Sequence, residues 1–301
     1  IIVINSCAVT QEAERQTRQK IYRAKRENPE SRVVVTGCSA QINPERFAKL
    51  KDVDAVVGNA EKLDPDFWSD LPSHLAEAKI QVNDIMSVRE TAGHMIHGFD
   101  GRSRAFIEVQ QGCDHRCTFC VIPYGRGPSR SVPAGEIVNQ ITALVNNGFK
   151  EVILTGVDLT DYGKGLPGSL TLTTLVRKIL KLVPELERLR LSSLDPMEMD
   201  DPLISLFGDE PRLLPSVHLS VQSGNNMILK RMKRRHQRED IIKVCEKLRE
   251  KRPEVTFGAD LIVGFPTENE EMFEDTRSLV QESKITQLHV FPYSQRDGTP
   301  A

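Results

Sequence analysis

Three cysteines fall within eight residues of the chain, where Cys113, Cys117 and Cys120 follow the spacing C-x3-C-x2-C. Three thiolates on one short loop can bind three irons of a cubane cluster, whereas most iron–sulfur clusters use four cysteines. A loop with no fourth cysteine nearby leaves one iron with an open coordination position. Such a position distinguishes a metal that reacts from one that only holds structure, a rule for zinc that we extend to iron. The spacing therefore predicts a reactive [4Fe–4S] cluster.

A zinc site is the alternative interpretation of the same loop. Zinc sites usually combine one closely spaced pair of cysteines with a second pair further along the chain, and His115 inside the loop is a further possible ligand. No second pair follows, because Cys245 stands alone in an amphipathic segment. We therefore favour iron and interpret Cys245 as a core residue, on one apolar helix stripe with Ile241, Ile242 and Leu248.

Two further cysteines follow predicted strands near the start of the chain. Residues 1–5 and 32–36 are apolar, β-branched runs, and a charged, helix-prone segment lies between them at residues 11–28. With a third strand at 54–58, this alternation predicts a small parallel α/β sheet. Cys7 and Cys38 would then lie at its carboxyl edge, where ligands bind in such sheets. Small buried residues at strand ends are the alternative interpretation of both cysteines.

The rest of the chain predicts an α/β fold of two domains. We expect a small parallel-sheet α/β domain at residues 1–60, a linker at 61–103 and a barrel domain at 104–301. The predicted barrel strands are residues 105–110, 151–155, 188–192, 217–221, 258–263 and 287–291. The predicted helices between them are residues 134–147, 171–182, 201–207, 239–251 and 269–283. A full eight-stranded barrel usually needs about 250 residues, so a partial (β/α)6 barrel fits better.

Composition excludes several other classes of protein. Of 301 residues, 39% are hydrophobic and 27% charged, which is typical of a globular chain and not of a disordered one. No apolar run is long enough to cross a bilayer, and no signal peptide is visible, so we expect a cytoplasmic protein without membrane contact. The first residues read as a strand entered midway, so we expect a fragment truncated at the front.

Several motifs together resemble a known family. The cysteine loop, which has Phe119 before its last cysteine and follows the first barrel strand, is similar to that of the radical S-adenosylmethionine superfamily. The flanking residues resemble the methylthiotransferases of that superfamily over essentially the whole chain, in order. The motifs that carry this resemblance are Asn5-Ser6-Cys7, Thr36-Gly37-Cys38, Pro123-Tyr124-Gly125-Arg126-Gly127, Leu154-Thr155-Gly156-Val157-Asp158, Gln222-Ser223-Gly224 and Asp260-Leu261-Ile262-Val263-Gly264-Phe265-Pro266.

The resemblance implies cofactors and a radical reaction. Cys113, Cys117 and Cys120 would hold a [4Fe–4S] cluster whose open iron binds S-adenosylmethionine. Reductive cleavage, with an electron from a donor protein, would give a radical that removes hydrogen from the substrate. Cys7 and Cys38 would be two of three ligands of a second [4Fe–4S] cluster that carries the sulfur to be inserted. The third ligand would lie upstream, the sulfur source is unknown, and a second S-adenosylmethionine would supply the methyl group.

The predicted contacts of S-adenosylmethionine are less directly tied to a motif. Phe119 could present its backbone to the cofactor adenine, and Gly156 could let backbone approach the methionyl group. Ser193 and Gln222 end later strands and face the same mouth of the barrel. Each of these residues could equally be a turn residue at a strand end.

Within the family, the resemblance is strongest to the branch that inserts a methylthio group at C2 of N6-threonylcarbamoyladenosine at tRNA position 37. The alternatives are the isopentenyladenosine branch, the branch that modifies an aspartate of a ribosomal protein, and, in a different class, a non-catalytic zinc-bearing RNA-binding module. The family usually ends in an RNA-binding domain, which we expect beyond residue 301. Residues 224–253 hold eleven basic and four acidic residues. Within them, the run 230–238, with Arg234 and Arg235, is a candidate contact for tRNA phosphates.

Overall fold

The computed structural model describes residues 1–89 and 103–301, and these residues form two compact units. The first unit comprises Ile1–Arg89, Gly112–Pro128 and Ser294–Ala301. The second comprises, of the described residues, 103–111 and 129–293. The cysteine loop therefore belongs to the same unit as Cys7 and Cys38, although about 75 residues of sequence separate it from Cys38.

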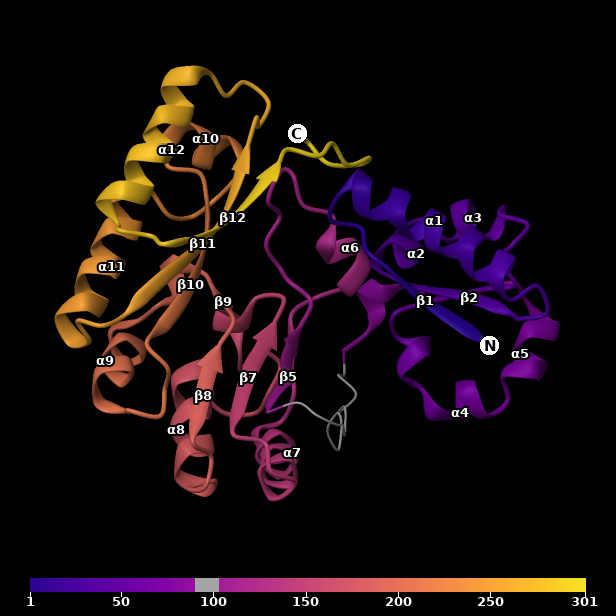
Figure 1. The fold of residues 1–301 in the computed structure, drawn as a ribbon, viewed down its shortest axis with the longest axis horizontal. Coiled ribbons are helices and arrows are strands. Elements are labelled where there is room, and N and C mark those ends of the chain that lie inside the picture. Colours follow the sequence, from indigo (N-terminus) through magenta and orange to yellow (C-terminus); the bar gives the residue numbers. More distant parts are fainter. Residues whose placement is uncertain (90–102) are drawn as a thin grey trace. The chain divides into compact units, whose positions relative to one another are not determined.

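A four-stranded parallel sheet in the order β1-β2-β3-β4 forms the centre of the first unit (Figure 1). Its strands are β1 (Ile2–Ser6), β2 (Val33–Gly37), β3 (Ala55–Val57) and β4 (Ile80–Gln81). The helices are α1 (Gln11–Glu27), α2 (Cys38–Ile42), α3 (Pro44–Ala48), α4 (Pro65–Ser69), α5 (Leu71–Glu77) and α6 (Ile122–Arg126), with short 3-10 turns at Glu61–Leu63 and Ile85–Ser87.

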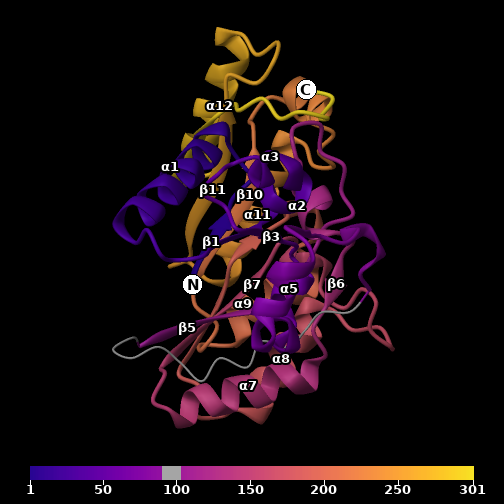
Figure 2. The same ribbon diagram turned by 90° about the vertical axis from the view of Figure 1, so that its right-hand side faces the viewer.

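Alternation of side chains along β2 gives this sheet two buried faces. Val35 packs on one face with Ile21 of α1 and Phe47 of α3, whereas Val34 packs on the other with Phe67 of α4. Figure 2 shows α1 and α3 on one side of the sheet and α5 on the other. A continuous run of buried β-branched residues is typical of parallel strands covered on both faces. The predicted parallel α/β sheet is thereby confirmed.

The segment after β3 differs from the linker that the sequence predicts at residues 61–103. Residues 61–88 contain α4, α5 and β4, and β4 extends the sheet by pairing with β3. The prolines and the lack of clear periodicity indicate an irregular segment, but Pro65 is here the first residue of a helix, α4, which the carboxylate of Asp64 caps. The first unit therefore extends beyond residue 60. Residues 90–102 of the predicted linker lie outside the described residues.

The second unit is a curved, largely parallel sheet with helices on one side (Figure 1). Its strands pair in the orders β6-β5-β7-β8 and β12-β11-β10-β9, and a single residue separates β8 from β9 along the chain. The strands are β5 (Arg104–Gln111), β6 (Arg130–Ser131), β7 (Glu151–Gly156), β8 (Arg188–Leu191), β9 (Ser193–Leu194), β10 (Ser216–Gln222), β11 (Thr256–Val263) and β12 (Gln287–Pro292). The helices are α7 (Ala134–Asn146), α8 (Leu172–Leu182), α9 (Asp201–Asp209), α10 (Asn226–Arg231), α11 (Arg238–Lys251) and α12 (Glu270–Glu282).

The core of the second unit lies between this sheet and its helices. Val217, Leu219 and Val221 of β10 are buried in it, while the intervening residues point to the opposite face. Each of the predicted barrel strands and helices is present within two residues of its expected bounds. The predicted partial barrel is confirmed as a half-barrel sheet. Among the described residues, no helix combines the length and apolar character needed to cross a membrane.

Candidate metal centre and cofactor site

The three-cysteine loop is a shaped turn held by its own backbone. The N–H of Cys120 donates to the carbonyl of Cys117 (3.1 Å), and the N–H of Cys113 donates to the carbonyl of Gly127 (3.1 Å). Arg116 also donates from its guanidinium to the carbonyl of Cys113 (3.3 Å). All three cysteines are half-buried, so the loop that the backbone hydrogen bonds hold in place remains partly open to solvent. This exposure suits ligands of a cofactor that must meet a substrate.

The loop continues into α6, which packs against α2 of the same unit. Val121, the residue after the last cysteine of the loop, is buried with Ala8 and Cys38. Ala8 follows Cys7 at the end of β1, and Cys38 is the first residue of α2. Apolar packing therefore ties the three-cysteine loop to the sheet edge that carries the other two cysteines.

Cys7 and Cys38 follow two strands that run side by side. Ser6 and Gly37 are partners in the parallel pairing of β1 and β2, so the cysteines after them lie at the same carboxyl edge, as predicted. Gly37 has φ +98°, and a Cβ on it would lie 2.2 Å from the carbonyl oxygen of Ser6, so only glycine fits there. Cys7 is exposed, whereas Cys38 is buried.

The sulfur of Cys38 has polar neighbours, which a core cysteine does not need. Arg126 of α6 donates from Nε to Sγ of Cys38 at 3.1 Å. The side-chain amide of Asn59, 4% exposed, lies 3.8 Å from the same sulfur and donates to the carbonyl of Gly125 at 2.6 Å. A guanidinium beside the sulfur offsets the charge of a thiolate, the form in which cysteine binds metal.

The donor chemistry of these five cysteines fits iron–sulfur clusters. The donor atoms are thiol sulfurs, and none of the six cysteines forms a disulfide. Cys245 differs, because it is fully buried in α11 and burial raises the pKa of its thiol to about 12. Its interpretation as a core residue is confirmed.

Gly156, a predicted cofactor contact, ends β7 beside a buried glutamine. A Cβ at Gly156 would lie 2.9 Å from Oε1 of Gln110 and 3.2 Å from Cα of Leu159. The same Oε1 accepts a hydrogen bond from the backbone N–H of Asp158 (2.8 Å). The absence of a side chain at Gly156 therefore lets Gln110 hold the turn after β7.

Ser193 and Gln222 lie in neighbouring strands of the second unit, β9 and β10. Ser193 shares a hydrogen bond with Ser220 (2.8 Å) and donates to the carboxylate of Asp260 (3.4 Å). Gln222 ends β10 with φ +70°, in the left-handed region. For a residue other than glycine, this conformation costs about 1 kcal/mol or more. Strain of this kind gathers at functional sites. Phe119 is half-buried in the loop of the first unit.

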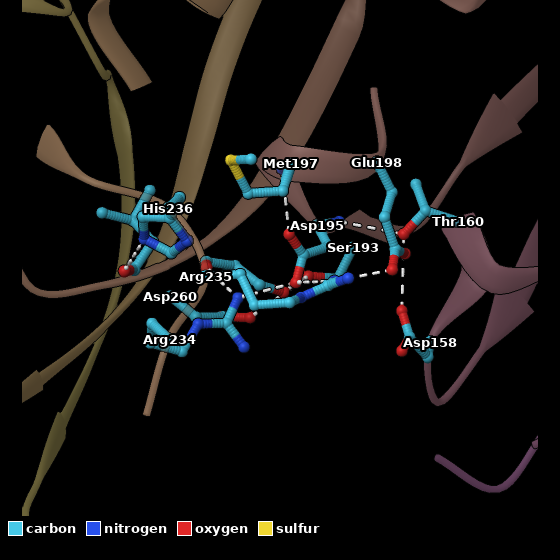
Figure 3. Close-up of polar contacts among 12 residues, drawn as sticks. Asp158, Thr160, Ser193, Asp195, Met197, Glu198, Arg234, Arg235, His236 and Asp260 are labelled. Atoms are coloured by element: carbon cyan, nitrogen blue, oxygen red, sulfur yellow. Dashed lines mark hydrogen bonds and ion pairs between the residues drawn. The ribbon is translucent and has the colours of Figure 1, made fainter. Parts of the chain in front are cut away.

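A network of buried charges follows the same strand ends (Figure 3). Asp195, 7% exposed, accepts from Arg234 at 3.0 Å and pairs with Arg235 at 3.2 Å. Arg235 also pairs with Glu198 (2.6 Å), and Arg234 donates to the carbonyl of Ser220 (3.0 Å). The network joins the turn after β9 to the turn after α10. Sequence reasoning did not find it, although Asp195-Pro196 directly after a strand resembles a helix-capping signal.

The prediction that Arg234 contacts tRNA phosphate is wrong, because its side chain is only 9% exposed and binds Asp195. The cause is the end of α10. Lys233 has φ +60°, and the N–H of Arg234 donates to the carbonyl of Leu229 (2.9 Å), a reversal that is typical of helix C-termini. This reversal turns the chain inward after α10. The basic run therefore contributes some residues to the surface, while Arg234 forms an internal ion pair.

Two family models match this chain. The radical SAM superfamily model matches residues 107–280, and the model of an uncharacterized protein family, UPF0004, matches residues 1–58. Solved structures agree on the fold: the radical S-adenosylmethionine methyltransferase TsrM from Kitasatospora setae has a TM-score of 0.69 at 15% identity, covering 97% of this chain and 60% of that one. The chain is a member of the radical S-adenosylmethionine superfamily. This membership supports iron over zinc in the three-cysteine loop.

Sequence relatives show to which family within this superfamily the chain belongs. The chain is 57% identical over its whole length to the threonylcarbamoyladenosine tRNA methylthiotransferase MtaB of Rickettsia prowazekii and spans 70% of that protein. It is 44% identical to the MtaB of Aquifex aeolicus, spanning 73% of it. It is 37% identical to a tRNA-2-methylthio-N(6)-dimethylallyladenosine synthase of Rickettsia rickettsii, spanning 69%. The chain belongs to the family of the threonylcarbamoyladenosine tRNA methylthiotransferases.

We expect substitution of Arg234 to act on folding. Removing one partner of a buried ion pair costs about 3–5 kcal/mol, because the other charge stays buried and loses its partner. Arg235 still faces Asp195 after the change Arg234→Ala, so the lower end of that range is expected for the free energy of unfolding. The matched control is Arg277→Ala, whose partner Glu274 is exposed, and which should cost less than about 1 kcal/mol. Equal losses in urea unfolding would contradict this account.

His236 makes the stability depend on pH. It is 2% exposed and donates from Nε2 to the carbonyl of Val221 (2.9 Å); burial and the nearby Arg234 lower its pKa to about 4. The unfolded chain binds this proton near pH 6.5, so the stability contributed by neutral His236 is complete above that pH and declines as pH falls toward 4. Between pH 7.5 and 5 the expected loss is about 2 kcal/mol. Urea unfolding of His236→Leu at both pH values should show a smaller difference than the wild type; an equal difference would refute the assignment.

Proposed function

We propose that this protein inserts a methylthio group at C2 of N6-threonylcarbamoyladenosine at tRNA position 37, in the cytoplasm. The observation that carries the proposal is the accessible three-cysteine loop in a chain that is 57% identical, over its whole length, to a relative named for that reaction. An isopentenyladenosine-type substrate is the second candidate, because a relative named for dimethylallyladenosine is 37% identical. The higher identity favours the first.

In this proposal the residues of the loop bind the first cluster and the cofactor. Cys113, Cys117 and Cys120 hold a [4Fe–4S] cluster, which supplies an electron for reductive cleavage of S-adenosylmethionine. The backbone hydrogen bonds inside the loop keep the three sulfurs in one turn. The residues that we assign to S-adenosylmethionine are Phe119, Gly156, Ser193 and Gln222. A separate electron donor protein is required.

We assign the second [4Fe–4S] cluster to Cys7 and Cys38, with one further ligand outside these residues. Support comes from the pairing of Ser6 with Gly37, which puts both cysteines at one sheet edge, and from the guanidinium of Arg126 at the Cys38 sulfur. Contacts to tRNA phosphates fall to the exposed basic residues of the run, which lie at the end of α10 or just after it: Lys230, Arg231, Lys233 and Arg235.

The first test is nucleoside mass spectrometry of tRNA from a strain that lacks the gene. The deletion should remove 2-methylthio-N6-threonylcarbamoyladenosine and leave its unmethylthiolated precursor. The wild-type gene should restore the product, and Cys113→Ala should not. Cys245→Ala is the matched control, because this cysteine lies in the helix core and its loss should leave the product present. Loss of a 2-methylthio isopentenyladenosine instead would assign the protein to the other branch.

The second test concerns Arg126 and the cluster assigned to Cys38. In a variant that lacks Cys113, Cys117 and Cys120, only the second cluster can assemble. The change Arg126→Gln removes a positive charge 3.1 Å from the Cys38 sulfur, so the reduced cluster, which carries more negative charge, becomes less stable. We expect a more negative midpoint potential in a titration followed by electron paramagnetic resonance.

The control for this titration is Arg23→Gln, which removes an exposed arginine of α1 that pairs only at the surface with Glu27. It should leave the midpoint potential at the value of the parent variant that lacks Cys113, Cys117 and Cys120. An equal potential in the Arg126 variant would show that this guanidinium does not face a cluster ligand. If the variant that lacks Cys113, Cys117 and Cys120 bound no iron under conditions that load the wild type, Cys38 would be a core cysteine and not a cluster ligand.

A further inference from the structure

The face of the second unit that points away from its helices carries a row of polar side chains. Along β10, Val217, Leu219 and Val221 enter the core, so His218 between them points to the opposite face. On β11, Ala259 and Leu261 enter the core on either side of Asp260. His289 of β12 is the pairing partner of Asp260, and paired residues share a face.

These three side chains, His218, Asp260 and His289, make one connected group, which we call the histidine strip. Oδ1 of Asp260 accepts hydrogen bonds from Nε2 of His218 (3.0 Å) and Nδ1 of His289 (3.1 Å). The two imidazole rings lie 4.8 Å apart. Ser193, which donates to the other oxygen of Asp260, joins the strip to the strand end that we assign to the cofactor.

The strip is a built feature of the sheet. A Cβ on Gly258 would lie 2.5 Å from Nδ1 of His218, so the ring of His218 occupies space that only a glycine leaves. Exposure rises along the strip, from 22% for the side chain of His218 and 25% for Asp260 to 64% for His289. One end is thus fixed inside the half-barrel and the other is open to an incoming group.

The charges of the strip fit a polar ligand. Burial alone would raise the pKa of Asp260, but the hydrogen bonds and charges of His218 and His289 outweigh it and lower that pKa. An ionised Asp260 offers an acceptor to a hydroxyl or amide N–H, and the exposed ring of His289 keeps its second nitrogen, Nε2, for a carboxylate or hydroxyl. A hydrocarbon group placed here would strip water from these polar atoms without returning a hydrogen bond, which costs binding free energy.

The relatives named above differ in this chemical property of their substrates. A threonylcarbamoyl group carries amide N–H groups, a hydroxyl and a carboxylate, whereas a dimethylallyl group is a hydrocarbon. We infer that the histidine strip reads the N6 substituent of the substrate adenosine and selects a hydroxyl- and carboxylate-bearing group over an isoprenoid one. This inference rests on the proposed function. It makes His289 the main residue that determines specificity, because its ring is the accessible one.

The test uses the holoenzyme with two transcripts of one tRNA, bearing either threonylcarbamoyl- or isopentenyl-adenosine at position 37. For His289→Phe we expect kcat/KM on the threonylcarbamoyl tRNA to fall about 10- to 100-fold, mainly through KM, as for the loss of a hydrogen bond to a charged group. The ratio of the two kcat/KM values should fall by a similar factor. His289→Gln, which keeps a donor, should recover part of the ratio.

Two outcomes would overturn the inference. An equal fall of kcat/KM on both tRNAs, or no fall, would mean that the strip does not read the substituent. A divalent metal bound at one equivalent by protein lacking Cys7, Cys38, Cys113, Cys117 and Cys120, and lost with His289→Phe, would assign the strip to a metal, since two histidines and a carboxylate also suit zinc. If the wild type modifies neither tRNA, the proposed function itself fails.

Discussion

The hydrogen bond from Arg126 to the sulfur of Cys38 stands at the centre of the first unit. It joins the helix that follows the three-cysteine loop to the sheet edge that carries the other two cysteines. Asn59 and Val121 support the same contact, one by hydrogen bonding and one by packing. Residues from three distant parts of the sequence are therefore folded as one body, which links the three-cysteine loop to the sheet edge that carries Cys7 and Cys38.

Buried charge has a different role in the second unit. Asp195 pairs with Arg234 and Arg235, and Arg235 also pairs with Glu198, so that the pairs connect turns at the carboxyl ends of the strands. A buried ion pair contributes little net stability, since desolvation offsets the attraction, but it admits few alternative arrangements. The strained backbone of Gln222 lies at the end of β10, whose Ser220 carbonyl Arg234 also binds. Ion-paired turns therefore surround the strained residue at this strand end.

Local patterns in the sequence predicted the elements well, and contacts across the chain poorly. Alternation and β-branched runs are enough to identify strands such as β10, because the polarity of each side chain indicates whether it is buried. The cysteine spacing is informative for the same reason, since all three ligands lie on one turn. Arg234 was misjudged because its environment depends on a single left-handed residue, Lys233, which charge counting does not detect. The partnership of Asp260 and His289 needs the register of two strands separated by a helix, and no local pattern contains it.

The fold by itself does not choose the substrate. TsrM from Kitasatospora setae has the same fold at a TM-score of 0.69 with only 15% identity, so the half-barrel is a scaffold for more than one reaction. What distinguishes one member from another must then lie in side chains on the open face and at the strand ends. On that face this chain has glycine, histidine and aspartate at positions where an apolar pocket would have leucine or phenylalanine. Burying polar side chains costs free energy unless they form hydrogen bonds. Such residues are therefore retained most readily where a polar ligand forms those hydrogen bonds.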